Sequence, residues 1–221
     1  MSTLSLPAQA YLLACDTGRD RLADRQRVAP LVRAAALTDL VLRGLVTDGD
    51  GRPVVTGAGG TGHLVLDDLL GDLAADPHRK WRGWVRRDAR ATLQSLETQL
   101  EAAGTITLKT SRVLGLFPRR RPVVRDRAEV ARLHEAVTAA LRGTEPASRV
   151  DPGVAALTSL AAAAELGTVF PRRERRQHKA RLAELEDRAG AAVPALRKVV
   201  RELKAARTAA ITAASSSGSG G

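Results

Sequence analysis

The sequence predicts a mostly α-helical protein with one β-hairpin, and two observations carry this prediction. First, the chain of 221 residues is 44% apolar but only 2% aromatic, so its core must be built from Leu, Val and Ala. Ala has the highest helix propensity, and its small side chain lets helices pack closely. Second, apolar residues recur at helical spacing through most of the chain, whereas residues 105–117 combine β-branched residues with a short polar turn.

The first two helices are predicted near the N-terminus. Residues 4–14 form a short helix with Pro7 in its first turn, where proline is tolerated because its missing N–H is not needed there. A second helix is predicted over residues 30–43, because its apolar residues fall on one stripe. Gly44 is predicted to end that helix.

The middle of the chain is predicted to mix short strands with helices. Residues 48–51, with the sequence Asp-Gly-Asp-Gly, separate two short apolar runs, a pattern typical of a small β-hairpin. A Gly-rich loop over residues 56–62 follows, and residues 64–73 are predicted as a short strand that runs into a helix. Residues 81–103 are predicted as one long helix, with Gly104 as its C-cap.

The strongest β signal lies at residues 105–117. Its two strands are predicted on either side of a turn at Thr110 and Ser111, and Pro118 is predicted to end the second strand.

Three helices are predicted for the remainder of the chain, over residues 127–142, 152–167 and 171–206. The last of them should break near Gly190 or Pro194. One domain is therefore expected over residues 3–206, followed by a disordered Ser/Gly tail at residues 207–221.

The charge balance favours polyanionic partners. Lys and Arg total 35 against 24 Asp and Glu, which gives a net charge of +11. Such an excess suits nucleic acid, anionic lipid or acidic protein, and part of it is explained by the Arg- and Ala-rich usage of a bacterial genome.

Cys15 is the only cysteine, so no intramolecular disulfide can form, and we expect it to be buried. Without a signal peptide or an apolar stretch of about 20 residues, the protein is expected to be cytoplasmic and at most peripherally associated with membranes.

No constellation of residues predicts catalysis, a cofactor or a metal site. Gly57, Gly59 and Gly62 have the spacing of a dinucleotide-binding loop, but the alternating strands and helices that this site requires are missing. A loop beyond a hairpin is the better interpretation. The four histidines are scattered without the paired spacing of zinc ligands, and no nucleophile is accompanied by a base. We therefore expect a non-enzymatic protein.

Basic residues gather in four groups, and each can be either a solvated surface or a binding surface. The groups are Arg21, Arg25, Arg27 and Arg33; Arg82, Arg86, Arg87 and Arg90; Arg119, Arg120, Arg121, Arg125 and Arg127; and Arg172, Arg173, Arg175, Arg176, Lys179 and Arg181. The third group directly follows the apolar residues Leu114, Leu116 and Phe117. Two interpretations stay open for that segment: a membrane-inserting wedge with a cationic collar, or an ordinary hairpin packed on the core.

Five segments, in order, resemble the Golgi phosphoprotein 3 family. They are the Leu-rich helix that ends at Asp16, the VRAAALTDLVLRG motif of residues 32–44, the GHLVLDDLL segment of residues 62–70, the helix and hairpin of residues 96–117, and the apolar helix of residues 154–170. The resemblance covers residues 4–188. It implies a helical core ringed by amphipathic helices, with a protruding β-hairpin that inserts in membranes and supports oligomerisation.

The resemblance also implies a ligand. Eukaryotic members of this family bind phosphatidylinositol 4-phosphate and the cytoplasmic tails of Golgi enzymes, through a pocket with one Trp and three basic residues. Arg33 and Arg90 fall on two of those basic positions, whereas Leu93 falls on the third and the Trp position falls near Asp24. The chain thus departs from the family pocket at two of its four positions. The residues that could substitute are Arg86, Arg87, Trp81 and Trp84.

These observations lead to one functional hypothesis and two alternatives. The hypothesis is a peripheral membrane adaptor that binds an anionic phospholipid, of the phosphoinositide type, and that could contact tails of membrane proteins or form a homo-oligomer through the hairpin. Arg33 and Arg90 would recognise the headgroup, Arg119, Arg120 and Arg121 would supply nonspecific attraction, and the apolar hairpin residues would insert. The alternatives are a nucleic-acid-binding protein, which the scarcity of aromatic residues disfavours, and a protein scaffold.

Overall fold

The computed structural model describes residues 4–57, 59–113, 117–191, 202, 203 and 205, and helices make up most of them. The prediction of a mostly α-helical protein with β-hairpins is confirmed. The helices are α1 (Leu6–Leu13), α2 (Arg25–Leu42), α3 (Leu64–Ala75), α4 (Trp81–Arg86), α5 (Ala89–Ala102), α6 (Arg127–Arg142), α7 (Pro152–Ala163), α8 (Arg172–Gln177) and α9 (Lys179–Ala191), with a 3-10 turn, η1, at Ala147–Arg149.

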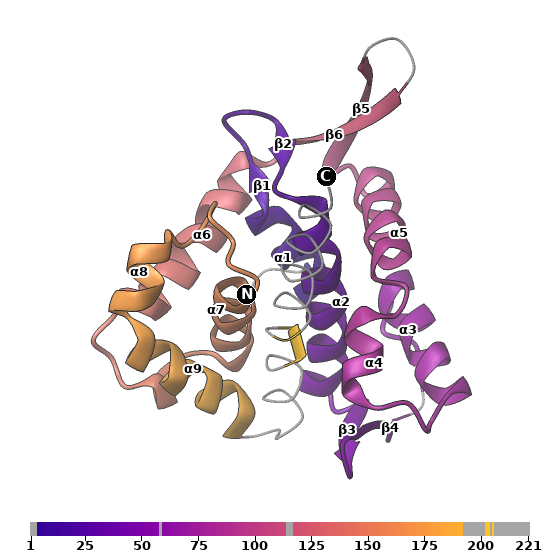
Figure 1. The fold of residues 1–221 in the computed structure, drawn as a ribbon, viewed down its shortest axis with the longest axis vertical. Coiled ribbons are helices and arrows are strands. Elements are labelled where there is room, and N and C mark those ends of the chain that lie inside the picture. Colours follow the sequence, from indigo (N-terminus) through magenta and orange to yellow (C-terminus); the bar gives the residue numbers. More distant parts are fainter. Residues whose placement is uncertain (1–3, 58, 114–116, 192–201, 204, 206–221) are drawn as a thin grey trace, which may run out of the picture.

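The described strands pair only as antiparallel two-stranded sheets. They are β1 (Cys15–Asp16) with β2 (Arg21–Leu22), β3 (Val46–Gly49) with β4 (Arg52–Val55), and β5 (Ile106–Val113) with β6 (Phe117–Val124). In Figure 1 the β5–β6 hairpin projects from the helical body, next to the small β1–β2 hairpin, while β3 and β4 lie at the opposite end.

Helix α2 is the centre of the core. It contacts α1, α3, α4, α5 and α7, and every residue from 31 to 41 is buried. A helix enclosed on all sides should be apolar around its whole circumference, and the Ala- and Leu-rich sequence of α2 meets this requirement. The prediction that this helix starts at Pro30 was wrong. It starts at Arg25, because the Asp24 carboxylate accepts a hydrogen bond from the Gln26 backbone N–H at 3.0 Å and caps the helix.

Two further predictions in the middle of the chain are corrected. The segment that begins at Leu64 is helical throughout, because burying Val65, Leu69 and Leu73 on one side requires helical rather than alternating spacing. The single long helix predicted from Trp81 is divided into α4 and α5 at Asp88, whose backbone φ of 50° lies in the left-handed region.

The predicted ending of α5 at Gly104 is confirmed. Gly104 has a φ of 70°, and the N–H of Thr105 donates to the carbonyl of Leu100 at 2.9 Å, as in a Schellman motif. The glycine therefore reverses the chain into β5.

The β5–β6 hairpin exists as predicted, but its turn lies elsewhere. Thr110 and Ser111 are strand residues that pair with Arg120 and Arg119, and the pairing continues to Val113 opposite Phe117. Thr110 is β-branched and therefore well suited to a strand, and Pro118 is accommodated because a two-stranded sheet consists only of edge strands. The three consecutive arginines, 119–121, thus belong to β6 and do not follow the hairpin. Leu114 and Leu116 lie outside the described residues.

The C-terminal part agrees with the prediction at α6, which spans the predicted residues, while α7 ends at Ala163, before the predicted residue 167. The last predicted helix is divided at His178, between α8 and α9, and continues through Gly190. Pro194 and the predicted tail at residues 207–221 lie outside the described residues.

Cys15 is buried, as expected. Among the described helices, none combines the length and the apolar character needed to cross a membrane.

Candidate functional site

A groove lies between the first turns of α2 and the junction of α4 with α5. Its volume is about 550 Å³, within the range of small-ligand sites. The residues that line it are Gln26, Ala29, Pro30, Arg86, Asp88, Ala89, Arg90 and Ala91. It therefore joins residues from two segments that are about 60 positions apart in the sequence, and it contains two of the predicted headgroup-binding arginines.

The groove is cationic. Arg86 and Arg90 are both exposed, and within the part of the chain that the structure describes neither forms an ion pair. The only acidic residue of the groove, Asp88, accepts a hydrogen bond from Nε of Arg87 at 3.2 Å. Two guanidinium groups therefore remain available to an anion, and each offers planar, paired N–H donors that match phosphate oxygens.

Arg33 lies beside the groove but not in it. Its side chain is buried, with 3% of the residue exposed. Nε donates to the carbonyl oxygen of Trp84 at 3.3 Å, and Nη1 donates to Oγ1 of Thr92 at 3.0 Å. Burial lowers the pKa of Arg33, and the nearby carboxylate of Asp72, at 3.5 Å, opposes that shift. Arg33 thus fastens α2 to both sides of the α4–α5 junction.

Trp84 is the centre of a cluster of cations. The guanidinium carbons of Arg33, Arg79 and Arg87 lie 5.8, 5.6 and 5.3 Å from the centroid of its ring. Each of the three arginines thus makes a cation–π contact with the same indole ring. Arg79 and Arg87 also share the carboxylate of Asp76, each at 2.9 Å, which offsets the repulsion between them.

The six predicted headgroup residues therefore separate into three places. Arg86 and Arg90 face the groove, while Arg33, Trp84 and Arg87 form the adjacent cluster. Trp81 is buried apart from both the groove and the cluster. Its Nε1 donates a hydrogen bond to Oδ1 of Asp48 at 2.6 Å, and this bond connects α4 to β3. Contact of any of these residues with a headgroup stays a prediction.

Sequence reasoning missed the α2 side of the groove. Gln26 and Ala29 lie before Pro30, where the helix was predicted to begin, and were therefore not placed on that helix. The signal was present in Asp24, a good N-cap residue placed directly before Arg25. Arg79 was also missed, because nothing in its sequence neighbourhood reveals that it packs on Trp84.

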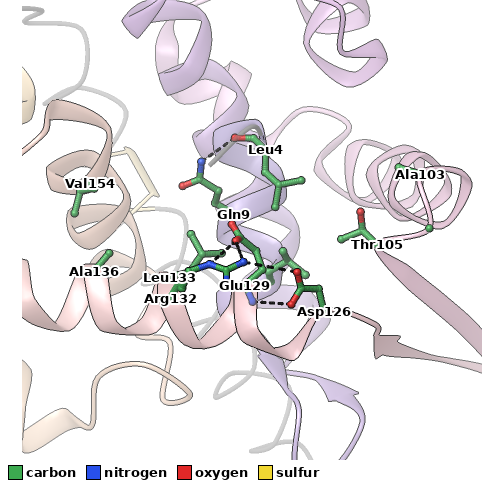
Figure 2. Close-up of a pocket in the computed structure, with 12 residues that line it drawn as sticks. Leu4, Gln9, Ala103, Thr105, Asp126, Glu129, Arg132, Leu133, Ala136 and Val154 are labelled. Atoms are coloured by element: carbon green, nitrogen blue, oxygen red, sulfur yellow. Dashed lines mark hydrogen bonds and ion pairs between the residues drawn. The ribbon is translucent and has the colours of Figure 1, made fainter. Parts of the chain in front are cut away.

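A second hollow, of about 810 Å³, opens between the start of α1, the end of α5 and α6. Figure 2 shows that its charged groups lie at the start of α6, where Nη2 of Arg132 contacts Glu129 at 2.7 Å and Asp126 at 3.7 Å. Its rim thus combines two carboxylates with one guanidinium. Such a rim is unsuited to an anionic headgroup, and none of the predicted site residues lies in it.

The Gly-rich segment forms the connection between β4 and α3. The carboxylate of Asp67 accepts hydrogen bonds from the backbone N–H of Thr61 at 2.6 Å and from its hydroxyl at 2.8 Å, and these bonds lower the pKa of Asp67. The loop is therefore fastened to the first turn of its own helix. Because the described strands pair only in antiparallel hairpins, this loop lacks the parallel sheet of a dinucleotide site.

The fold and the groove together define a class: a helical protein built around one buried helix, with a projecting two-stranded hairpin and an open cationic groove at its side. Residues 6–203 match the Golgi phosphoprotein 3 (GPP34) family. The chain therefore belongs to this family, and the resemblance noted in the sequence is confirmed. No curated protein matches the chain.

Proposed function

We propose that this protein is a peripheral membrane adaptor that binds an anionic phospholipid headgroup of the phosphoinositide class in the groove between α2 and the α4–α5 junction. The observation that supports this most is the pair of exposed arginines, Arg86 and Arg90, which face one groove without a partner among the described residues. Membership of the Golgi phosphoprotein 3 family is consistent with adaptor-type binding and with a non-enzymatic role.

Selectivity would come from geometry rather than from charge alone. A single arginine near an anionic surface contributes only about 1 kcal/mol, and salt screens that contribution. Two guanidiniums held in one groove can instead grip a phosphate group in a fixed orientation. Arg33 would act indirectly, since its bonds to Trp84 and Thr92 hold the two walls of the groove together.

The β5–β6 hairpin would supply the second contact. It projects from the helical body (Figure 1), and its apolar residues Leu114, Leu116 and Phe117 would enter the bilayer. Arg119, Arg120 and Arg121 would attract anionic lipid from within β6. Contacts with cytoplasmic tails of membrane proteins and oligomerisation through this hairpin belong to the same proposal.

Vesicle co-sedimentation tests the groove. The wild type should prefer vesicles with phosphatidylinositol 4-phosphate over phosphatidylserine vesicles of equal charge. Arg90→Ala and Arg86→Ala should remove this preference. Arg82→Ala is the matched control, because Arg82 is exposed on the same α4 helix but does not line the groove. It should weaken binding to both kinds of vesicle only slightly and equally.

Two results would contradict the proposal. If both groove variants keep the wild-type lipid preference, the groove does not bind the headgroup. If the protein binds duplex DNA more tightly than any anionic vesicle at the same salt concentration, the nucleic-acid alternative is favoured.

Phe117→Asp tests the hairpin separately, since placing a carboxylate in the acyl region is costly and should weaken binding even at low salt.

A further inference from the structure

A second cationic pocket, apart from the groove, lies between the β1–β2 hairpin, β6 and α6. Its volume is about 880 Å³. Four arginines from three segments line it: Arg19 and Arg21 beside and within β2, Arg25 at the start of α2, and Arg121 on β6. Strands β2 and β6 lie side by side, which brings residues about 100 positions apart into one pocket (Figure 1).

The acidic residues nearby do not balance these arginines. Arg19 and Arg21 both lie 3.5 Å from the same carboxylate, that of Asp16. Arg25 is held by the buried Glu97, and Arg121 is exposed with no ion pair among the described residues.

The remaining carboxylate of the pocket, that of Asp24, lies 3.4 Å from Nε of Arg27, which does not line the pocket. The pocket and its immediate partners therefore carry about two positive charges in excess.

His134 of α6 contributes a neutral hydrogen-bonding group to the same pocket. It is half-buried, and no hydrogen bond to its ring occurs in the described part of the chain. Burial lowers the pKa of His134, so the ring is uncharged at neutral pH. A neutral imidazole carries one N–H donor, from which a bound anion could accept a hydrogen bond.

We propose that this pocket binds a phosphate monoester or inorganic phosphate, held by Arg21 and Arg121 from two adjacent strands and by His134 from α6. A phosphate monoester carries a charge of about −1.5 to −2 at neutral pH, which matches the excess positive charge of the pocket. Arg21 and Arg121 provide the paired N–H donors that such a group prefers. This pocket shares no lining residue with the groove proposed for the lipid headgroup. Inorganic phosphate therefore tests it without any membrane.

Nuclear magnetic resonance of the histidine rings gives the first test. Titration of inorganic phosphate into the full chain should shift the ring signals of His134 and leave those of His63 and His78 unchanged. The variant with Arg21→Ala and Arg121→Ala should raise the dissociation constant for phosphate roughly tenfold, because it removes charge-assisted hydrogen bonds. Both residues are exposed, so the variant should fold normally.

Arg52→Ala is the control, since Arg52 is an exposed arginine of β4 at the opposite end of the molecule. It should bind phosphate as the wild type does. The same variants with phosphatidic acid vesicles distinguish the source of the phosphate: a parallel loss indicates a lipid headgroup, and unchanged vesicle binding indicates a soluble phosphate. An unshifted His134 ring, or equal phosphate affinity in the double variant and the wild type, would overturn the proposal.

Discussion

Arg25 and Glu97 form a two-point ion pair between α2 and α5, although 72 positions separate them in the sequence. Nη1 of Arg25 lies 2.8 Å from Oε1, and Nη2 lies 2.6 Å from Oε2. Glu97 is 1% exposed, and the hydroxyl of Tyr11 also donates to its Oε1, at 2.9 Å. One buried carboxylate on α5 thus connects α1, α2 and α5.

Glu97→Ala should therefore destabilise the protein by about 3 kcal/mol, because it leaves the buried Tyr11 hydroxyl and the Arg25 guanidinium without their acceptor. Urea unfolding measures this change. The control is Glu135→Ala on the exposed face of α6, which should change the free energy of unfolding by less than about 0.5 kcal/mol. A loss below about 1 kcal/mol for Glu97→Ala would show that the network contributes little.

Asp39 should contribute more to the free energy of unfolding, through α1, than Ser5, the residue at the N-cap of α1. Ser5 occupies that position but makes no side-chain cap bond, whereas the Asp39 carboxylate, from α2, accepts the backbone N–H of Leu6 at 2.7 Å. We expect Asp39→Ala to cost about 1 to 2 kcal/mol and Ser5→Ala less than about 0.5 kcal/mol. Equal losses for the two variants in urea unfolding would contradict this assignment.

Arg33 and Arg90 should behave differently when each is replaced by alanine. Arg33 is buried and hydrogen-bonded, so its loss should lower the free energy of unfolding by about 2 to 3 kcal/mol. Arg90 is exposed, so its loss should cost less than about 0.5 kcal/mol while changing lipid binding. Thermal unfolding and vesicle binding of both variants separate the two roles. Full stability of Arg33→Ala would show that Arg33 does not fasten the junction.

Cys15 should make the protein less stable at alkaline pH. Burial raises the pKa of its thiol from 9.0 to about 12, with a smaller contribution from Glu97. Above pH 9.0 the unfolded chain loses this proton while the folded chain keeps it, so stability is fully present below pH 9.0 and is lost as the pH rises toward 12.

Cys15→Ala removes this contribution, and urea midpoints measured across that interval should therefore decline less steeply for the variant. Burial also raises the pKa of Tyr11, so part of the alkaline decline should remain in the variant. Parallel curves for the variant and the wild type would show that Cys15 does not contribute.

Local features of the sequence were sufficient for much of the fold. The bounds of α6 were predicted correctly, because Asp126 caps the helix by accepting the Glu129 backbone N–H at 2.9 Å, and this contact spans only three positions. The end of α5 at Gly104 was predictable for the same reason, since a left-handed C-cap depends on one residue type. The ordered family segments were likewise visible in the sequence.

The turn of the main hairpin was not predictable in this way. Thr110 and Ser111 are polar enough for a turn, but cross-strand pairing places them opposite Arg120 and Arg119. Register depends on both strands and on how the hairpin base packs, with Ile106 and Val124 buried. A local pattern contains only one strand at a time.

The sequence by itself determined the helical class, the caps that begin and end individual helices, and the excess of arginine over acid. Only the tertiary structure decided which arginines are available. Arg33 and Arg90 are equivalent as side chains, yet the packing of α2 against α4 and α5 buries the first and leaves the second exposed. Helix propensity and capping act over a few positions, whereas the burial and pairing of a charge depend on helices that are distant in the sequence.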